Sequence, residues 1–328
     1  MRSLSDPLPW LLLSLAASLL ATRGALAYSR ARQLLDQPGE RRSHVTPTPR
    51  GGGIGMVMVF VLALLFGWWQ WPGSRPILSM LLPGMVMVAA IGWLDDPRPV
   101  SSLTRLAVHL LAAGLLAAGV LWQGSGIGMA LLAFVLALGL VNAWNFMDGI
   151  NGIAAAQAAV VALAVALLAA APASLLALAL VGACCGFLPF NAPRARIFMG
   201  DVGSGALGLA LAGIVVLGAG RDWQLALLLA MPLGAFVVDT ALTLTRRIMR
   251  RERWWEPHVQ HLYQRMARKY GHMPVTAAYS AWGLLAVAAA VTIAGLAGNA
   301  VVIASAAWLV ATMLLWAWLD ARGRVVEG

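Results

Sequence analysis

Charged residues are scarce in this chain of 328 residues: they make up 11%, while 61% of the residues are hydrophobic. A soluble globular domain has about 25% charged and 45–50% apolar residues, so the composition excludes that class. The alternation typical of half-buried strands is also missing. Apolar runs of about 20 residues recur instead from end to end. They predict an all-α integral membrane protein, because polar backbone in contact with lipid must be satisfied within each helix.

Long polar segments and cysteine clusters are missing as well. The longest polar stretch runs only from 246 to about 274, so we expect residues 1–328 to form a single polytopic membrane domain. Cys184 and Cys185, the two cysteines, are neighbours inside an apolar run, which indicates helix packing rather than redox chemistry. Neither a thiol cluster nor a His-Glu-x-x-His pattern indicates zinc.

The apolar runs predict about eleven membrane-spanning helices. Their expected ranges are 8–28, 52–71, 77–94, 105–123, 127–142, 152–172, 174–189, 204–220, 223–245, 275–297 and 300–319. The segments between them alternate in character. Short, nearly neutral connections follow every second span, and longer basic connections follow the others.

The basic connections indicate the orientation of the chain, because loops rich in arginine and lysine stay in the cytoplasm. Segment 29–51 carries five arginines, and segment 246–274 carries seven arginines and one lysine. The N-terminus is therefore expected in the periplasm and the C-terminus in the cytoplasm. The first apolar run resembles a cleavable signal ending at Ala27, but cleavage there would expose five arginines outside, so we expect an uncleaved span. The formal net charge of +10 then reflects topology, and nucleic-acid binding is not expected.

Most of the remaining polar residues fall in the connections predicted to face the cytoplasm. They are Asp95 and Asp96 in "IGWLDDPRP", Asn142, Asn145, Asp148 and Asn151 in "NAWNFMDGING", Asn191 and Asp201 in "FNAPRARIFMGDVGSG", and His258, His261 and Arg265 in "EPHVQHLYQR". Ionisable residues at a bilayer are costly and usually functional. Their convergence at one depth predicts a site there, to which the loop at about 246–274 contributes.

Each motif also has a structural interpretation. Asp95 and Asp96 could belong to a turn, and Asn142, Asn145 and Asp148 could satisfy a polar helix end. Asp201 could cap a helix, or the start of that helix could bind an anion. Asp239, inside a predicted span, could pair with a basic neighbour.

Taken together, the motifs favour a metal-dependent site. Several carboxylates held close together repel one another unless a cation lies among them. Carboxylates, amides and water suit Mg²⁺, which also binds substrate phosphates. Arginines and histidines around such a centre suit a diphosphate substrate.

Five ordered stretches resemble the polyprenyl-phosphate N-acetylhexosamine-1-phosphate transferases. They are "RSHVTPTPRGGG", "GWLDD", "NAWNFMDGINGIAA", "FMGDVGSGALG" and "HVQHLYQR". The resemblance implies a Mg²⁺-dependent enzyme, with Mn²⁺ as an alternative ion, in the bacterial inner membrane with its active site facing the cytoplasm. It would transfer an aminosugar 1-phosphate from a UDP-N-acetylaminosugar to undecaprenyl phosphate and release UMP. The partners implied are these two substrates and the lipid bilayer, with a homodimer left open.

The resemblance also implies roles for individual residues. Asp201 and Asp96 would hold the metal, and Asp95 would orient or deprotonate the lipid phosphate; these three are the expected catalytic residues. The expected substrate-binding residues are His44, Thr48, Arg50, Asn142, Asn145, Asp148, Asn151, Asn191, His258, His261 and Arg265.

The sequence departs from the family pattern at two places. The peptidoglycan branch has three consecutive histidines in the last long loop, whereas this chain has His258-x-x-His261, which favours the branch that initiates O-antigen and related polysaccharides. The acid pair is followed by Pro97, Arg98 and Pro99, so the third acid of the fuller motif is missing.

Three alternatives stay open at this point. A transporter would place its acids near the bilayer midplane in two related halves, and no internal repeat is evident. A phosphatidyl-alcohol transferase would need an Asp-Gly-x-x-Ala-Arg motif, which "DGINGIAA" does not match. A membrane scaffold would not need five ordered polar motifs.

Overall fold

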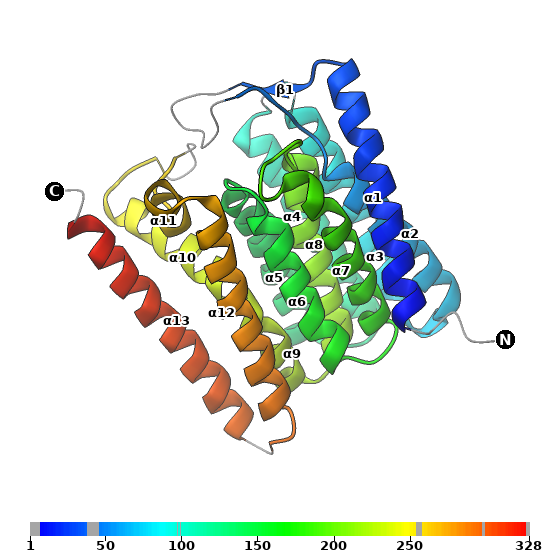
Figure 1. The fold of residues 1–328 in the computed structure, drawn as a ribbon. Helices are drawn as coiled ribbons and strands as arrows, with labels where there is room; N and C mark the ends of the chain where they lie inside the picture. Colours follow the sequence, from blue (N-terminus) through cyan, green and yellow to red (C-terminus); the bar gives the residue numbers. More distant parts are fainter. Residues whose placement is uncertain are drawn as a thin grey trace.

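The chain folds into a bundle of helices, seen here in a computed structural model that describes residues 7–37, 46–96, 98, 100–253, 258–296 and 299–325. In the described part, the first eight helices are α1 (Pro7–Ala31), α2 (Ile54–Gln70), α3 (Arg75–Asp95), α4 (Ser102–Trp122), α5 (Ile127–Met147), α6 (Ile153–Leu168), α7 (Ala173–Asn191) and α8 (Asp201–Ala219). They are followed by α9 (Trp223–Ala230), α10 (Gly234–Met249), α11 (Leu262–Tyr270), α12 (His272–Ile293) and α13 (Asn299–Val325). The helices other than α11 pack into one bundle, with α1 and α13 at opposite edges (Figure 1).

All eleven predicted spans coincide with helices, which confirms the all-helical polytopic class. Within the described residues, nine helices are long and apolar enough to cross a membrane, with α9 and α10 counted as one broken helix. The apolar helices α2 and α6 are shorter, with 17 and 16 residues. α1 begins at one end of the bundle and α13 ends at the other, as an odd number of crossings requires (Figure 1).

Helix α8 forms the centre of the bundle. Of its 19 residues, 17 are buried, and it packs against α2 to α7 and α9. Glycine and alanine are frequent along it, so its neighbours approach closely, as is usual when helices pack in lipid. The first residue of this buried helix is Asp201, so the fold brings a carboxylate to the middle of one end of the bundle.

The ninth predicted span, 223–245, is broken. A 3₁₀ turn at Met231–Leu233 separates α9 from α10, because Pro232 has no N–H for the helical ladder. The buried Gln157 of α6 donates its Nε2–H to the carbonyl of Pro232 at 2.8 Å, which compensates for a backbone bond at the break.

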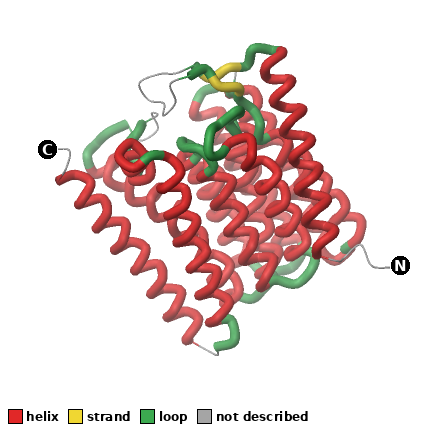
Figure 2. Tube along the Cα trace, in the orientation of Figure 1, coloured by secondary structure: helices red, strands yellow, loops and turns green. Residues whose placement is uncertain are grey.

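Three short elements were not predicted from the sequence. The connection at 29–51 contains an antiparallel pair of two-residue strands, β1 (Leu35–Asp36) and β2 (Thr48–Pro49). The loop at 246–274 contains the amphipathic helix α11. All three lie at the same end of the bundle (Figures 1 and 2).

Candidate active site

The predicted acids meet where three helices end or begin. Asp95 is the last residue of α3, Asp96 caps it, Asp148 caps α5 and Asp201 opens α8. Oδ1 of Asp96 accepts a hydrogen bond from the backbone N–H of Asp201 at 3.0 Å. The acid pair thus lies against the free N–H groups of a helix N-terminus, where negative charge is favoured.

Two glycines make this contact close. A Cβ added to Gly200, whose φ is +77°, would lie 2.4 Å from Oδ2 of Asp96. A Cβ added to Gly92, on the last turn of α3, would lie 2.4 Å from the backbone of Asp201. The "GWLDD" and "FMGD" motifs therefore need glycine so that the two helix ends can touch.

Arg50, which the resemblance gave only as a substrate-binding residue, lies at the centre of the acids. Its Nε is 2.7 Å from Oδ1 of Asp96, and its Nη2 is 2.9 Å from Oδ1 of Asp201. Burial disfavours the guanidinium charge, but the Asp96 and Asp201 carboxylates outweigh that effect and raise the pKa of Arg50. Arg50 is therefore a fixed positive charge between the two predicted metal ligands.

Arg105, on the first turn of α4, is a site residue that sequence reasoning missed. Its Nη1 is 2.9 Å from Oδ2 of Asp95 and 3.4 Å from Oδ2 of Asp201. Asp95 is held further by the N–H of Val100 at 2.6 Å. The signal in the sequence was an arginine at the start of a predicted span, and such residues usually anchor a helix at the interface.

Crowding of carboxylates affects their ionisation. Burial raises the pKa of Asp96 to about 7, against the opposing effect of Arg50 and with the further help of the charge on Asp201. Burial, and then the charge on Asp201, raise the pKa of Asp148 well above its usual range. Added positive charge would relieve this repulsion.

The residues fit a hard divalent cation in part. Oδ2 of Asp96 is buried and has no hydrogen-bond partner among the described residues. Within the same residues, no three histidine, cysteine or acidic side chains form a complete metal cage. Mg²⁺ typically takes one or two carboxylates and completes its shell with water and substrate phosphates, so the pair of Asp96 and Asp201 fits such a site.

A cavity of about 480 Å³ opens beside the acids, between α3, α4, α5 and α8. Its apolar wall includes Val88, Ile91, Leu103, Leu106 and Phe146, and its polar wall includes Arg105, His109, Asn142, Asn145 and Asp201. The cavity therefore offers an apolar surface next to an arginine and a carboxylate.

The amides of the "NAWNFMDGING" motif divide between the cavity and the loops. Oδ1 of Asn142 lies 3.3 Å from Nδ1 of His109, and Nδ2 of Asn145 donates to Oγ of Ser204 at 3.2 Å. Asn151 lies outside the cavity lining and donates to the carbonyl of Pro193 at 2.9 Å.

Two further predicted binding residues are engaged with backbone groups. Asn191 accepts from the N–H of Gly152 at 2.7 Å and donates to the carbonyl of Ile197 at 3.0 Å. Thr48 is buried in β2 and donates to the carbonyl of Thr46 at 3.0 Å. His44 lies outside the described residues.

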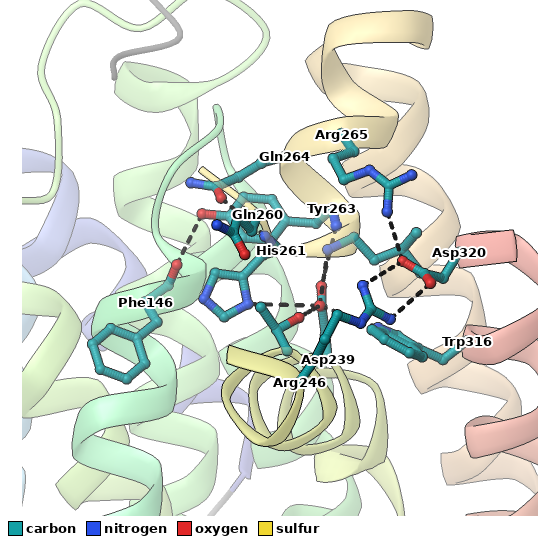
Figure 3. Close-up of polar contacts among 12 residues, drawn as sticks. Phe146, Asp239, Arg246, Gln260, His261, Tyr263, Gln264, Arg265, Trp316 and Asp320 are labelled. Carbon is teal, nitrogen blue, oxygen red and sulfur yellow. Dashed lines mark hydrogen bonds and ion pairs between the residues drawn. The ribbon is translucent and has the colours of Figure 1, made fainter. Parts of the chain in front are cut away.

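The last predicted group lies at the start of α11, where His261 is next to Phe146 of the cavity wall. The ring of His258 lies over that of His261 with 4.9 Å between centroids, and His261 stacks in turn on Phe146 at 6.2 Å. Only 2% of His261 is exposed. Arg265 points toward α13, where its Nη1 contacts Oδ1 of Asp320 at 2.6 Å (Figure 3).

Comparison with known proteins identifies the family. The profile of glycosyl transferase family 4 matches residues 78–219, which include the acids, Arg105 and the cavity. A decaprenyl-phosphate N-acetylglucosaminephosphotransferase of Mycobacterium leprae (strain TN) is 33% identical over 304 residues, covering 78% of this chain and 76% of the relative. Its counterpart from Mycobacterium tuberculosis (strain ATCC 25618 / H37Rv) is 32% identical, covering 84% and 78%.

A phospho-N-acetylmuramoyl-pentapeptide-transferase of Synechococcus sp. (strain JA-3-3Ab) is 35% identical over a shorter alignment of 245 residues, covering 67% of this chain and 68% of the relative. Several relatives above 30% identity thus align over two-thirds or more of the chain, and the family profile spans its acid centre. The chain belongs to glycosyl transferase family 4, the polyprenyl-phosphate N-acetylhexosamine-1-phosphate transferases.

Proposed function

We propose that this protein transfers N-acetylglucosamine 1-phosphate from UDP-N-acetylglucosamine to a polyprenyl phosphate, releases UMP and so initiates a surface glycan. The observation that carries the proposal is the juxtaposition of Asp96, Asp201 and two arginines with an apolar cavity of about 480 Å³. A reaction between a sugar diphosphate and a lipid phosphate needs a charged centre and an apolar channel side by side.

The cavity supports a role in binding the acceptor. Its apolar wall suits the first isoprene units, and Arg105 at its polar end suits the phosphate, which carries between one and two negative charges near neutral pH. Asp95 holds Arg105 at 2.9 Å and would orient the acceptor phosphate through it. Because the phosphate is already ionised, a strong base is not required.

Asp96 and Asp201 would hold Mg²⁺ at the donor diphosphate, with Mn²⁺ as the alternative ion. When bound, the ion would neutralise charge on the phosphate oxygens. Arg50 adds a fixed positive charge there. Asn142 and Asn145 would lie where the polar end of the acceptor cavity meets the donor pocket. Asp148 would line the donor pocket, with Asn151, Asn191 and Thr48 shaping its loops. His258 would approach the donor, and the burial of His261 and the contact of Arg265 with Asp320 favour a role for these two residues in supporting His258.

The reaction is an in-line displacement at phosphorus. An oxygen of the acceptor phosphate forms a bond with the sugar-proximal phosphorus, and the bond from that phosphorus to the bridging oxygen breaks as UMP leaves. Such transfers depend chiefly on positioning and on stabilising the charge that develops on phosphate oxygens. We favour this direct attack over an aspartyl intermediate.

We assign the site to the cytoplasmic face of a bacterial inner membrane. The longer basic connections and the acid centre lie at the same end of the bundle, and basic loops mark the cytoplasmic side. The N-terminus would then lie in the periplasm. This end is also where a nucleotide-activated sugar would be available.

The choice of N-acetylglucosamine follows from two observations. The relatives named for this sugar align over 78–84% of the chain, and the last loop lacks three consecutive histidines. Those relatives are named for decaprenyl phosphate, whereas the sequence resemblance pointed to undecaprenyl phosphate. Both lipids carry the same phosphate head group, so the assay compares the two polyprenyl lengths. Among possible products, the sequence favours O-antigen or a related polysaccharide.

The transporter alternative fits the structure poorly. Asp95, Asp96, Asp148 and Asp201 lie at helix ends on one side of the bundle and not near the middle of the spans. Coupling carboxylates of transporters usually lie near the bilayer midplane.

The test is UMP release by the purified protein, supplied with Mg²⁺, decaprenyl or undecaprenyl phosphate and a panel of UDP-N-acetylaminosugars. We expect release with UDP-N-acetylglucosamine that requires both lipid and metal. Release only with a muramyl-pentapeptide donor would overturn the sugar assignment. Absence of release with every donor, from folded protein, would overturn the proposed function.

A further inference from the structure

We propose that Asp239 is a positioning residue that fixes the start of α11, and with it His258 and His261, against the wall of the active-site cavity. This inference rests on the proposed function for its kinetic consequence. The geometry that supports it lies outside the acid centre, on α10 to α13 (Figure 3).

Asp239 is completely buried and saturated with donors. Its Oδ1 accepts from the N–H of Leu262 at 2.9 Å, and its Oδ2 accepts from the N–H of Tyr263 at 3.1 Å. The side chains of Thr243, Tyr279 and Trp316 donate at 3.2, 2.8 and 3.2 Å. One carboxylate therefore joins α10, α11, α12 and α13, and its charge lies at the N-terminus of α11, where it is favoured.

From α11 the contacts continue to the cavity. The hydroxyl of Tyr263 donates to the carbonyl of Phe146 at 2.9 Å, and the His261 ring stacks on the Phe146 ring (Figure 3). Phe146 itself lines the cavity beside Asp201. A Cβ added to Gly149 would lie 2.2 Å from the Tyr263 hydroxyl, so the loop after α5 accommodates this side chain closely. A shift at the start of α11 would therefore move both the histidines and the cavity wall.

Attachment of the helices alone does not account for Asp239. A buried charge at this depth is costly, and apolar residues of similar volume often stabilise a protein as well or better. A second carboxylate, Asp320 of α13, already ties α10 and α11 together through Arg246 at 2.7 Å and Arg265 at 2.6 Å. Asp239 also fixes the orientation of the first turn of α11, because it accepts hydrogen bonds from two successive backbone N–H groups directly after His261.

The experiment compares full-length wild type with Asp239→Asn. Asparagine keeps the size but presents an N–H donor to one of the two backbone donors. We expect faster amide hydrogen exchange at Leu262 and Tyr263, and a rise of about 10- to 100-fold in KM for UDP-N-acetylglucosamine, the range seen when a residue that orients a ligand group is lost. KM for the polyprenyl phosphate should rise less than KM for the donor, because the α11 loop reaches the acceptor cavity only through Phe146. Asp222→Asn is the matched control, because Asp222 is exposed and caps α9, where asparagine caps equally well.

Two further variants distinguish positioning from general folding. Tyr263→Phe removes the hydroxyl contacts of this side chain, including the hydrogen bond to Phe146, and should reproduce part of the KM effects with unchanged exchange elsewhere in the bundle. In a double-mutant cycle, Asp239→Asn should add little to the KM effect of His261→Ala, because both act on the same loop.

The outcomes distinguish a failure of the proposed function from a failure of the positioning role of Asp239. Wild-type protein that folds but releases no UMP would refute the proposed function, whatever the exchange data show. Active wild type with an Asp239→Asn variant whose folded fraction has wild-type KM, or whose two KM values rise equally, would refute the positioning role. Additive effects in the cycle would refute it as well.

Discussion

Replacing Gly200 by alanine should abolish most of the transfer activity while leaving the helix bundle intact. Gly200 precedes α8 with φ at +77°, and a Cβ there would lie 2.4 Å from Oδ2 of Asp96 and 3.1 Å from the N–H nitrogen of Gly51. In proteins, Cβ atoms are essentially never found within 3.0 Å of a heavy atom from a residue that is not adjacent in the chain. The Asp96 carboxylate would therefore have to move by at least about 0.6 Å.

The magnitude follows from what holds Asp96 in place. Its Oδ1 contacts the Asp201 N–H at 3.0 Å and Arg50 Nε at 2.7 Å, so a shift of this size breaks or lengthens both contacts. Misplacement of a reacting group by about 1 Å can reduce a rate by about 100-fold. The backbone strain of a non-glycine residue in this region adds about 1–3 kcal/mol to the cost of folding, which affects stability more than rate.

Gly220→Ala is the matched control. Gly220 lies at the other end of the same helix, has φ at +58°, and would place its Cβ in open space. Both variants should lower the melting temperature in detergent to a similar extent, because both introduce a side chain at positive φ. Only Gly200→Ala should lower the initial rate of UMP release by about 100-fold. Equal rates in the two variants, or equal losses, would refute the argument that Gly200 provides space for Asp96.

Three further predictions concern the polar groups. Asp96→Asn and Asp201→Asn should each abolish UMP release and leave the thermal melting profile unchanged. Chelation of divalent ions should abolish UMP release by the wild type. Near wild-type turnover in either variant would remove that residue from its role. Arg105→Ala should raise KM for the polyprenyl phosphate by about tenfold or more, because a charge-assisted contact is lost. KM for the donor should stay nearly unchanged. The reverse pattern would place Arg105 at the donor. Burial, and then the charges of His261 and Arg247, lower the pKa of His258 to about 4. As the pH falls from about 6.5 toward 4, the imidazole of His258 is therefore protonated in the unfolded chain before it is protonated in the folded protein, which lowers stability. The melting temperature of the wild type should fall more between pH 7 and 5 than that of His258→Gln. Parallel plots of melting temperature against pH for the two proteins would contradict this.

The spans and the meeting of the acids could be predicted from the sequence because they depend on simple regularities. Hydrophobic runs of sufficient length become helices in lipid, and successive crossings return every second connection to the same side. Asp95 and Asp148 end two such crossings and Asp201 begins another on the same side, so their convergence follows from the count alone. The same reasoning explains why Asp96 was expected near Asp201 before any contact was known.

Other features depend on packing that the sequence pattern does not express. Arg50 follows a proline in a polar connection, and its sequence position does not show that it reaches Asp96 and Asp201. Arg105 begins an apolar span and so resembles an interfacial anchor. Helix α11 has only nine residues, with charged residues among its apolar ones, so no apolar run marks it. The contacts of its first turn with Asp239 are made by backbone groups, which any residue type carries.

Asp96 and Asp239, two of the carboxylates at this end of the bundle, differ in one decisive respect. Asp239 accepts five hydrogen bonds from groups of the protein itself, so its oxygens have no capacity left for a ligand. Asp96 contacts Arg50 and the N–H of Asp201 through Oδ1, but its buried Oδ2 makes no hydrogen bond of normal geometry to the described residues. A polar atom in that condition costs free energy that a bound cation or donor would recover. The chemistry is therefore assigned to Asp96 and its neighbours, and Asp239 is assigned to holding the adjacent loop, although both carry the same functional group at the same end of the bundle.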